Sequence, residues 1–255
     1  MLIIIPPSTT MDMTSAPQTE AMTVPVFEKN ATYLAHLFSQ YSVAALEHLF
    51  KISEPLAEKA YEEYRQFDTA TPKPAILAFK GALYKTLEPA SFTSDEMAFA
   101  QQHVRILSSL YGVLKPLDGI KAYRSTFFLS LNGLPDKDLA HYWHQPITDH
   151  LIGDASRKNH EILYLSVLDM LKVVDVAKMS EQNKVVIVKF KDLRDGEWKI
   201  IREYEKPAVA NLVAWLVKHK IDQLETVKQW SWNGYAFNPD LSDAGNWVFT
   251  RNAHE

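Results

Sequence analysis

Four consecutive large apolar residues, Leu2-Ile3-Ile4-Ile5, stand near the start of the chain and are followed at once by Pro6-Pro7. An uninterrupted apolar run of this length predicts a strand that is buried on both faces. The run is too short for the hydrophobic core of a signal peptide or for a membrane span, and no basic residue precedes it. No later stretch approaches the roughly 18 uncharged apolar residues that a span needs. We therefore expect a soluble, cytoplasmic protein with no membrane contact.

Two helices are predicted in the first quarter of the chain. Apolar residues on one helical face indicate a helix over residues 42–51. The sequence Ser53-Glu54-Pro55 resembles a cap followed by a first-turn proline, which would open a second helix ending near Phe67. The small and polar residues 13–24 are expected to form a loop between the first strand and the first helix.

A third helix is predicted from a capping box, in which Thr93 is the cap and Glu96 stands three residues later. Apolar residues then recur at steps of three and four as far as Tyr111. Gly112 can end such a helix in a left-handed turn. The periodicity thus predicts one continuous helix from Thr93 to Tyr111.

The second half of the chain mixes strand and helix signals. Residues 161–167 indicate a strand, and residues 185–190 and 198–204 indicate the two arms of a hairpin around Asp195-Gly196. Pro207 is expected to start a helix, because its missing N–H would be unpaired there anyway. Since strands and helices do not strictly alternate, we predict an α+β fold in a single mixed domain over residues 1–255.

Composition excludes several kinds of site. The 255 residues contain no cysteine, which rules out disulfides, thiolate metal sites, iron–sulfur clusters and thiol nucleophiles. The formal charge of −4 is unlike that of a DNA-coating protein, although a local basic patch can still bind DNA. The chain also lacks a Gly-x-Ser-x-Gly elbow, a Walker loop, a GxGxxG run and an HExxH pair. No spacing fixes a nucleophile or a base, so we do not expect an enzyme, and we name no cofactor.

Four segments together resemble the YaaA peroxide-stress family over nearly the whole chain. They are the opening strand and loop (2–12), residues 76–84 (ILAFKGALY), residues 99–124 (FAQQHVRILSSLYGVLKPLDGIKAYR) and residues 233–251 (NGYAFNPDLSDAGNWVFTR). The resemblance implies protection from hydrogen peroxide through limiting free intracellular iron. It also implies binding of double-stranded DNA in a positively charged cleft, with a helix-hairpin-helix-like element around residues 95–124.

The chain departs from the family pattern at polar positions. The lysine of the family's Pro-Ala-Lys-Thr signature is Thr9 here, an arginine of its Lys-Lys-Ala-Arg-Gly run is Val209, and a further arginine is Ala214. The glycine before Leu110 is Ser109. These changes replace basic or flexible residues and leave the apolar framework in place. They indicate a divergent member whose polar site has moved or weakened.

Seven basic residues remain at family-like positions and are our candidates for binding DNA or another anion. Cations bind a phosphate backbone by charge and by releasing counterions, so several must converge on one groove. The bland alternative is that they are solvated or paired surface cations. The candidates are Lys80, Arg105, Lys115, Arg124, Lys172, Lys206 and Arg251.

Histidines and aromatic residues offer weaker signals. His141 and His144 are three apart and would share a helical face, but two imidazoles do not make a metal site, so we predict none. The aromatic cluster from Trp230 to Trp247 carries few cations, which favours core packing over base stacking.

Three functions remain open from the sequence. The leading hypothesis is a non-enzymatic stress protein that makes weak, sequence-tolerant contact with double-stranded DNA. The first alternative is a small-anion or nucleotide-binding enzyme, in which Lys80, Arg124 and Lys172 converge on one pocket and Asp118 and Asp169 act as acids or bases. The second is a paralogue with a degenerate site that acts through a protein partner.

Overall fold

The computed structural model describes residues 1–15, 21–157, 161–165 and 168–252. Its main sheet is mixed and has the strand order β11-β12-β13-β9-β8-β1-β5-β6, with β10 also paired to β9. The strands are β1 (Leu2–Ile5), β5 (Val104–Ser108), β6 (Gly112–Leu114), β8 (Ile162–Tyr164), β9 (Val185–Arg194), β10 (Glu197–Lys199), β11 (Ser231–Trp232), β12 (Tyr235–Phe237) and β13 (Asn246–Asn252). The fold is therefore α+β, as predicted.

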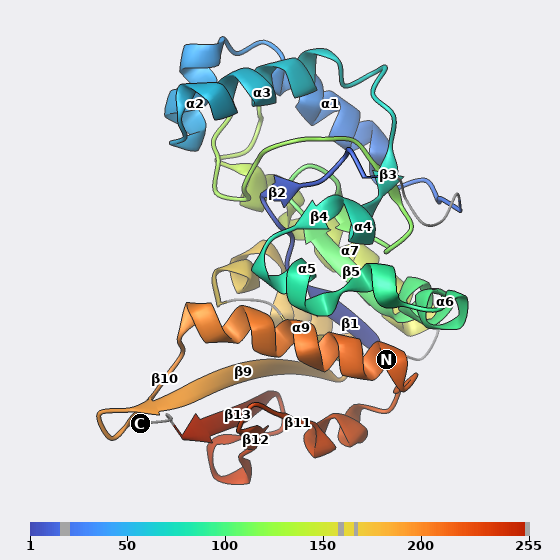
Figure 1. Cartoon of the computed structure of the whole chain (residues 1–255), viewed down its shortest axis with the longest axis vertical. Helices are drawn as coiled ribbons and strands as arrows, with labels where there is room; N and C mark the ends of the chain where they lie inside the picture. Colours follow the sequence, from blue (N-terminus) through green and yellow to red (C-terminus); the bar gives the residue numbers. More distant parts are fainter. Residues whose placement is uncertain (16–20, 158–160, 166–167, 253–255) are drawn as a thin grey trace.

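Helices are spread along the whole chain and pack in groups (Figure 1). Helices α1 to α3 gather at one end of the molecule, and α9 lies along β9 near the other end. Helices α5 and α6 pack on α9, while α7 packs on α8 and β6. The helices are α1 (Glu28–Phe38), α2 (Val43–Phe50), α3 (Glu54–Arg65), α4 (Ala75–Ala78), α5 (Ala82–Leu87), α6 (Ser94–His103), α7 (Leu139–Arg157), α8 (Val176–Gln182) and α9 (Arg202–Lys218), with 3-10 turns η1 (Pro89–Ser91), η2 (Leu168–Val173), η3 (Leu224–Gln229) and η4 (Pro239–Leu241).

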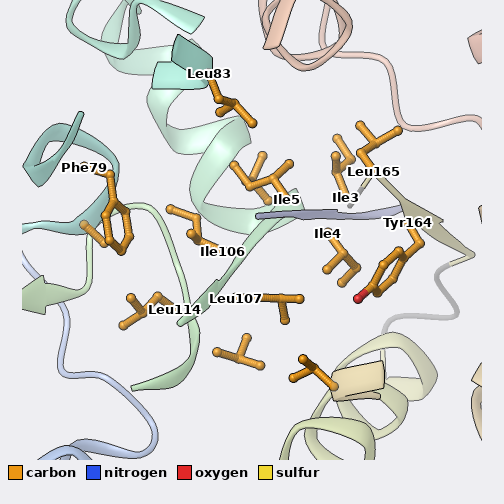
Figure 2. Close-up of a cluster of buried hydrophobic side chains, with 14 of the residues drawn as sticks. Ile3, Ile4, Ile5, Phe79, Leu83, Ile106, Leu107, Leu114, Tyr164 and Leu165 are labelled. Atoms are coloured by element: carbon orange, nitrogen blue, oxygen red, sulfur yellow. The ribbon is translucent and has the colours of Figure 1, made fainter. Parts of the chain in front are cut away.

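Strand β1 is an interior strand of the sheet, with β5 and β6 between it and one edge, and its residues are fully buried. It pairs in parallel with β5 on one side and with β8 on the other. Because side chains alternate along a strand, Ile4 points to the face on which Tyr164 and Leu107 lie, while Ile3 and Ile5 point to the face covered by Leu83 of α5 (Figure 2). The sequence prediction of a strand buried on both faces is confirmed.

Two short two-stranded sheets tie the loops to this frame. Strand β2 (Thr10–Met11) pairs with β4 (Phe79–Lys80), and β3 (Lys73–Pro74) pairs with β7 (Gly119–Ile120). Both pairs join segments that are far apart in the sequence. The pairing of β2 with β4 holds the segment that leaves β1, which is where the candidate site lies. None of the helices in the described part of the chain is both long enough and apolar enough to cross a membrane.

The predicted helix from Thr93 to Tyr111 is wrong beyond His103. Its capping box is present, but the chain leaves α6 at His103 and continues as strand β5 and hairpin strand β6. All of residues 95–124 are described, and α6 is their only helix, so the helix-hairpin-helix-like element is not confirmed. The segment Val104–Ser108 is buried throughout and forms parallel strand pairing with β1. This pairing and burial decide its structure, although its apolar spacing also fits a helix.

Other boundaries also differ from the expectation. The second hairpin strand, β10, ends at Lys199, and α9 begins at Arg202, so Pro207 lies inside the helix near its start. The hairpin itself is confirmed by the pairing of β10 with β9. The expected strand over 161–167 is β8, and its residues 166–167 lie outside the described part of the chain.

Candidate functional site at the carboxyl ends of the parallel strands

A cavity of about 310 Å³ opens where the parallel strands β1 and β5 end. Its walls come from the segment after β1, the start of α5, the residues after β5, the loop that follows β7, the turn η2 and helix α9. The lining residues are Pro6, Pro7, Ser8, Thr9, Thr10, Gly81, Ala82, Leu83, Tyr84, Ser109, Tyr123, Ser125, Thr126, Phe127, Met170 and Lys206.

The sheet topology explains why a cavity forms at this edge. After β1 the chain crosses to β5 on one side of it, whereas after β8 it crosses to β9 on the opposite side. Where the connections after two neighbouring parallel strands run in opposite directions, a crevice forms between them at the carboxyl ends of the strands. Ligands of open sheets with parallel strands bind in this crevice, so the cavity is our candidate site.

The lining is rich in hydroxyl groups. Lys206 is the one charged side chain among the described residues that line the cavity, and it is exposed. Deeper in the wall, Ser109 and Ser125 are buried and their hydroxyl oxygens lie 2.6 Å apart in a hydrogen bond. The site can therefore offer several hydrogen-bond donors and one positive charge to a ligand.

One wall is held by bonds between side chains and backbone. The Ser8 hydroxyl donates to the carbonyl oxygen of Lys80, and the Tyr84 hydroxyl donates to the carbonyl of Pro6 at 3.0 Å. Gly81 has a φ of +119°, and a Cβ at this position would lie 2.8 Å from Ser8 Oγ. Only glycine allows this close approach, which brings the start of α5 against the segment after β1.

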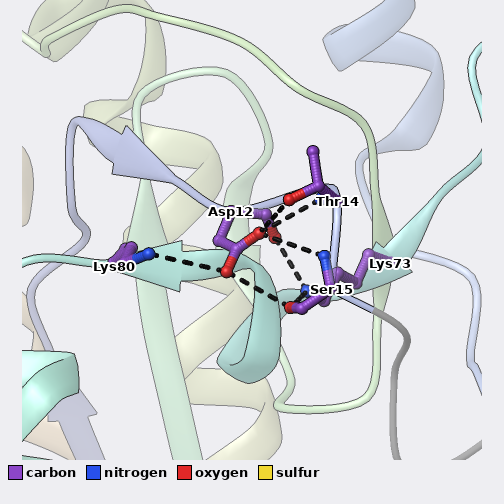
Figure 3. A network of polar contacts seen from close by, with 5 residues as sticks. All are labelled: Asp12, Thr14, Ser15, Lys73 and Lys80. Carbon is purple, nitrogen blue, oxygen red and sulfur yellow. Dashed lines mark hydrogen bonds and ion pairs between the residues drawn. The ribbon is translucent and has the colours of Figure 1, made fainter.

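A carboxylate next to this wall organises the following loop (Figure 3). Asp12 accepts hydrogen bonds from the backbone N–H groups of Thr14 and Ser15 and from both hydroxyls, and it lies 3.6 Å from Lys80 Nζ. The bonds from the Ser15 and Thr14 N–H groups are the main reason that the pKa of Asp12 lies well below its usual range. Lys73 is buried and donates to the Asp12 carbonyl and to Ser15 Oγ.

Sequence reasoning did not single out Asp12. The signal was present, because Asp followed by Thr and Ser two and three residues later is typical of a turn in which the carboxylate caps the backbone N–H groups. Lys73 gave no such signal, since its partners lie about 60 residues earlier in the sequence.

Four of the seven candidate cations line the cavity or stand within two residues of its lining in the sequence. Lys206 lines it directly. Lys80 and Arg124 are each next in sequence to lining residues, and Lys172 follows two residues after the lining residue Met170. Lys80, Lys172 and Lys206 are exposed, and Arg124 is half-buried.

The other three candidates lie elsewhere. Arg105 and Lys115 line a separate cavity of about 240 Å³ near the amino end of β5. Arg105 is fully buried, and its Nε and Nη2 lie 2.7 and 2.6 Å from Asp154 Oδ2. Arg251, on the last strand, lies 2.6 Å from Asp192 Oδ1.

Two arginines are thus positioned by internal partners. The Arg251 guanidinium also stacks on the rings of Tyr204 and Tyr235, at 4.5 Å from each ring centroid. A buried, paired guanidinium contributes to the packing of the protein and presents little charge to solvent. Of the seven candidates, Lys206 therefore lines the cavity, and Lys80, Arg124 and Lys172 stand within two residues of its lining in the sequence, whereas Arg105, Lys115 and Arg251 lie elsewhere.

The positions that depart from the family pattern fall in two places. Thr9 lines the cavity, where the family pattern has a lysine. Val209 is buried in α9, and Ala214 on the same helix is half-buried against the core. Val209 and Ala214, which replace charged residues of the family pattern, therefore pack in or against the core, whereas the change at Thr9 lies in the candidate site itself.

The histidines of α7 do not converge. His141 Nδ1 lies 2.7 Å from Asp138 Oδ1. No group of three or more metal-ligating side chains occurs among the residues described. Burial, with a smaller contribution from the cations Arg105, Arg157 and Lys115, lowers the pKa of His150, although Asp154 opposes this change. The predicted core packing of the C-terminal aromatic residues is confirmed, since Trp230, Tyr235 and Trp247 are buried.

Comparisons with known proteins find one family over most of the chain. The family model described as "Peroxide stress protein YaaA" matches residues 1–241. A "UPF0246 protein" of Clostridium beijerinckii is 34% identical over all of this chain and 99% of its own length. Similar proteins of Parabacteroides distasonis and Saccharophagus degradans are 31% and 34% identical, each over 98% of this chain and 99% of their own length.

Proposed function

We propose, because the chain belongs to the YaaA peroxide stress family, that it acts in the cytoplasm during peroxide stress by contacting double-stranded DNA around the mouth of the cavity. The observation that supports this proposal is that Lys206 lines the cavity while Lys80, Arg124 and Lys172 each stand within two residues of a lining residue in the sequence. Lys80 is paired with Asp12, so Arg124, Lys172 and Lys206 are the cations that we propose supply positive charge here, in a chain with a net charge of −4.

The proposed contact is with the phosphate backbone. The cations around the mouth come from the strand β4, the loop that follows β7, the turn η2 and the helix α9. Exposed lysines bind phosphates as point charges and do not read base edges, so the contact is weak and tolerant of sequence. Limiting iron damage would follow from shielding the duplex, and this role rests on the same contact.

A salt titration tests this proposal. Binding of a labelled duplex of about 20 base pairs is measured by fluorescence anisotropy between roughly 20 and 200 mM salt. We expect affinity to fall steeply with salt for the unmodified protein. Replacing both Lys172 and Lys206 with alanine should weaken binding and reduce the slope of log K against log salt by about 0.9 for each lost contact.

Lys218→Ala is the matched control. Lys218 is exposed on the same helix as Lys206, twelve residues further on, which places it roughly 18 Å away along the helix axis. It should leave both affinity and slope unchanged. Absence of binding at low salt, or equal effects of the Lys206 and Lys218 variants, contradicts the proposal. In cells, the Lys172 and Lys206 double variant should fail to restore peroxide resistance to a strain that lacks the gene.

A further inference from the structure

The interior of the cavity is chemically different from its mouth. Among the described lining residues there is one lysine and no carboxylate, although acidic residues outnumber basic ones in the whole chain by 31 to 27. Hydroxyl groups supply most of the remaining polar lining. Those of Ser8 and Tyr84 already donate to backbone carbonyls and that of Tyr123 is bonded to Ser108, so the hydroxyls that can serve a ligand are those of Thr9, Thr10, Thr126 and the pair Ser109 and Ser125. A cavity with donors and a cation but without a described acid favours a ligand that carries negative charge.

The buried pair of serines leaves one donor for such a ligand. Ser109 and Ser125 are 2% and 4% exposed, and their two hydroxyls carry two hydrogens. The 2.6 Å bond between them uses one hydrogen. No acceptor among the described residues takes the second hydrogen, so one O–H group of this pair is left to donate to a ligand. A ligand oxygen in the cavity can supply that acceptor.

The remaining lining is apolar. Leu83, Phe127 and Met170 contribute carbon surface next to the hydroxyls. The volume of about 310 Å³ lies at the lower end of the range for sites that bind small molecules. A small organic body with one charged end matches this division better than a bare inorganic ion does.

We infer that the cavity binds a monophosphate group attached to a small organic body, with the phosphate between Lys206 and the serine and threonine hydroxyls. A tetrahedral phosphate has several oxygens that can each accept from a different hydroxyl, while a single lysine supplies the charge. A carboxylate is better matched by the flat fork of an arginine, and no arginine lines the cavity in the described part of the chain. The inference concerns the interior and does not require the mouth to bind duplex DNA.

Titration calorimetry with the full chain tests this inference, using inorganic phosphate and a deoxynucleoside monophosphate as probes. The mononucleotide should bind more tightly than phosphate, because its body adds apolar contact. Lys206→Ala should weaken its binding about tenfold or more, since a hydrogen bond to a charged group is lost. Ser125→Ala should weaken binding severalfold, and Lys218→Ala should bind like the unmodified protein.

Lys206 and Lys218 are both exposed, so neither variant is expected to disturb folding, and circular dichroism checks this. The inference is overturned if neither probe binds at concentrations up to about 10 mM, or if Lys206→Ala and Lys218→Ala bind the probes equally well. These results do not depend on duplex affinity, so the cavity and the DNA proposal can fail separately.

A second arm identifies the source of the phosphate. The same duplex is offered with a 5′-monophosphate end and with a 5′-hydroxyl end. A preference for the phosphorylated end that free mononucleotide competes away assigns the group to a DNA strand terminus. Mononucleotide binding without such a preference assigns it to a free metabolite. Both results support a monophosphate site in the cavity.

Discussion

Lys73 Nζ donates a hydrogen bond of 2.8 Å to the backbone carbonyl of Asp12, 61 positions earlier in the chain. The lysine is 4% exposed, and it also donates to Ser15 Oγ at 2.7 Å. The loop is thus held by two groups. The Lys73 ammonium donates to its backbone carbonyl at Asp12, and the Asp12 carboxylate accepts hydrogen bonds from its N–H groups at Thr14 and Ser15. This pair of residues links β3 to the segment that leaves the candidate site.

Replacing Lys73 with methionine should therefore destabilise the protein. The change keeps most of the apolar stem but leaves the Asp12 carbonyl and Ser15 hydroxyl without this donor. We expect the free energy of unfolding, measured by urea denaturation, to fall by about 1–3 kcal/mol. The same replacement at the exposed Lys218 should have little effect. Equal stabilities of the two variants would show that the bonds to the loop contribute nothing.

Arg251 should matter for stability and not for DNA contact. Its guanidinium lies 2.6 Å from Asp192 Oδ1, and both side chains are buried. Arg251→Met leaves the buried Asp192 carboxylate with the Tyr235 hydroxyl but without its cation, which should lower the free energy of unfolding by about 3 kcal/mol. The salt slope of duplex binding should stay unchanged at a temperature where the variant is folded. A reduced slope would instead place this arginine at the DNA contact.

An exposed ion pair gives the comparison for Arg251. Lys220 Nζ lies 3.2 Å from Asp95 Oδ2, and both side chains are at least half exposed. Lys220→Ala should change the free energy of unfolding by less than about 1 kcal/mol, because solvent screens such a pair. The two variants are measured by the same urea denaturation.

Gly112 and Gly196 separate two reasons for needing glycine. Both have a positive φ, of +70° and +77°, but a Cβ on Gly112 would lie 2.7 Å from Trp143, whereas nothing lies within 4 Å of one on Gly196. Gly196→Ala should cost only the left-handed conformation, about 1 kcal/mol. Gly112→Ala should cost distinctly more, because the buried Trp143 must also move. Thermal melting of the two variants side by side checks the difference.

Glu205 should make stability fall as pH rises from about 4.5 to 6. Burial raises its pKa from 4.5 to about 6, although Arg202 and Lys206 oppose the rise. Because the folded state holds the proton more tightly, the contribution is fully present below pH 4.5 and is lost as pH rises through about 6. Glu205→Gln should therefore be more stable than the unmodified protein at pH 7.5, by on the order of 1 kcal/mol. Stability curves that run parallel from pH 4 to 8 would contradict this assignment.

How far the sequence predicts the fold depends on whether a signal is local. Strand β1, the helices α2 and α3, the capping box at Thr93 and the hairpin around Asp195-Gly196 were all predicted, because each rests on residues within one turn or strand. The segment Val104–Ser108 was not, because its apolar spacing fits a helix as well as a strand. Its state is decided by the parallel ladder with β1, about a hundred residues earlier in the sequence.

The same limit applies to the candidate site. The sequence identified Lys80, Arg124, Lys172 and Lys206 as basic residues in matched segments, and of these Lys206 lines the cavity in the structure. It did not show that Arg105 and Arg251 are held by Asp154 and Asp192, because those pairings are made across 49 and 59 positions. Burial and partner choice depend on contacts between distant segments, which no local pattern contains.

The position of β1 between β5 and β8 has a consequence for how the protein is made. A ribosome completes Leu2–Ile5 long before Val104–Ser108 and Ile162–Tyr164, the two strands that flank it. During synthesis the most apolar strand must therefore remain without either neighbour while about a hundred further residues emerge. Such a nascent chain exposes an unpaired strand edge, which makes it a substrate for chaperones and prone to aggregate when translation stalls before β5 is released.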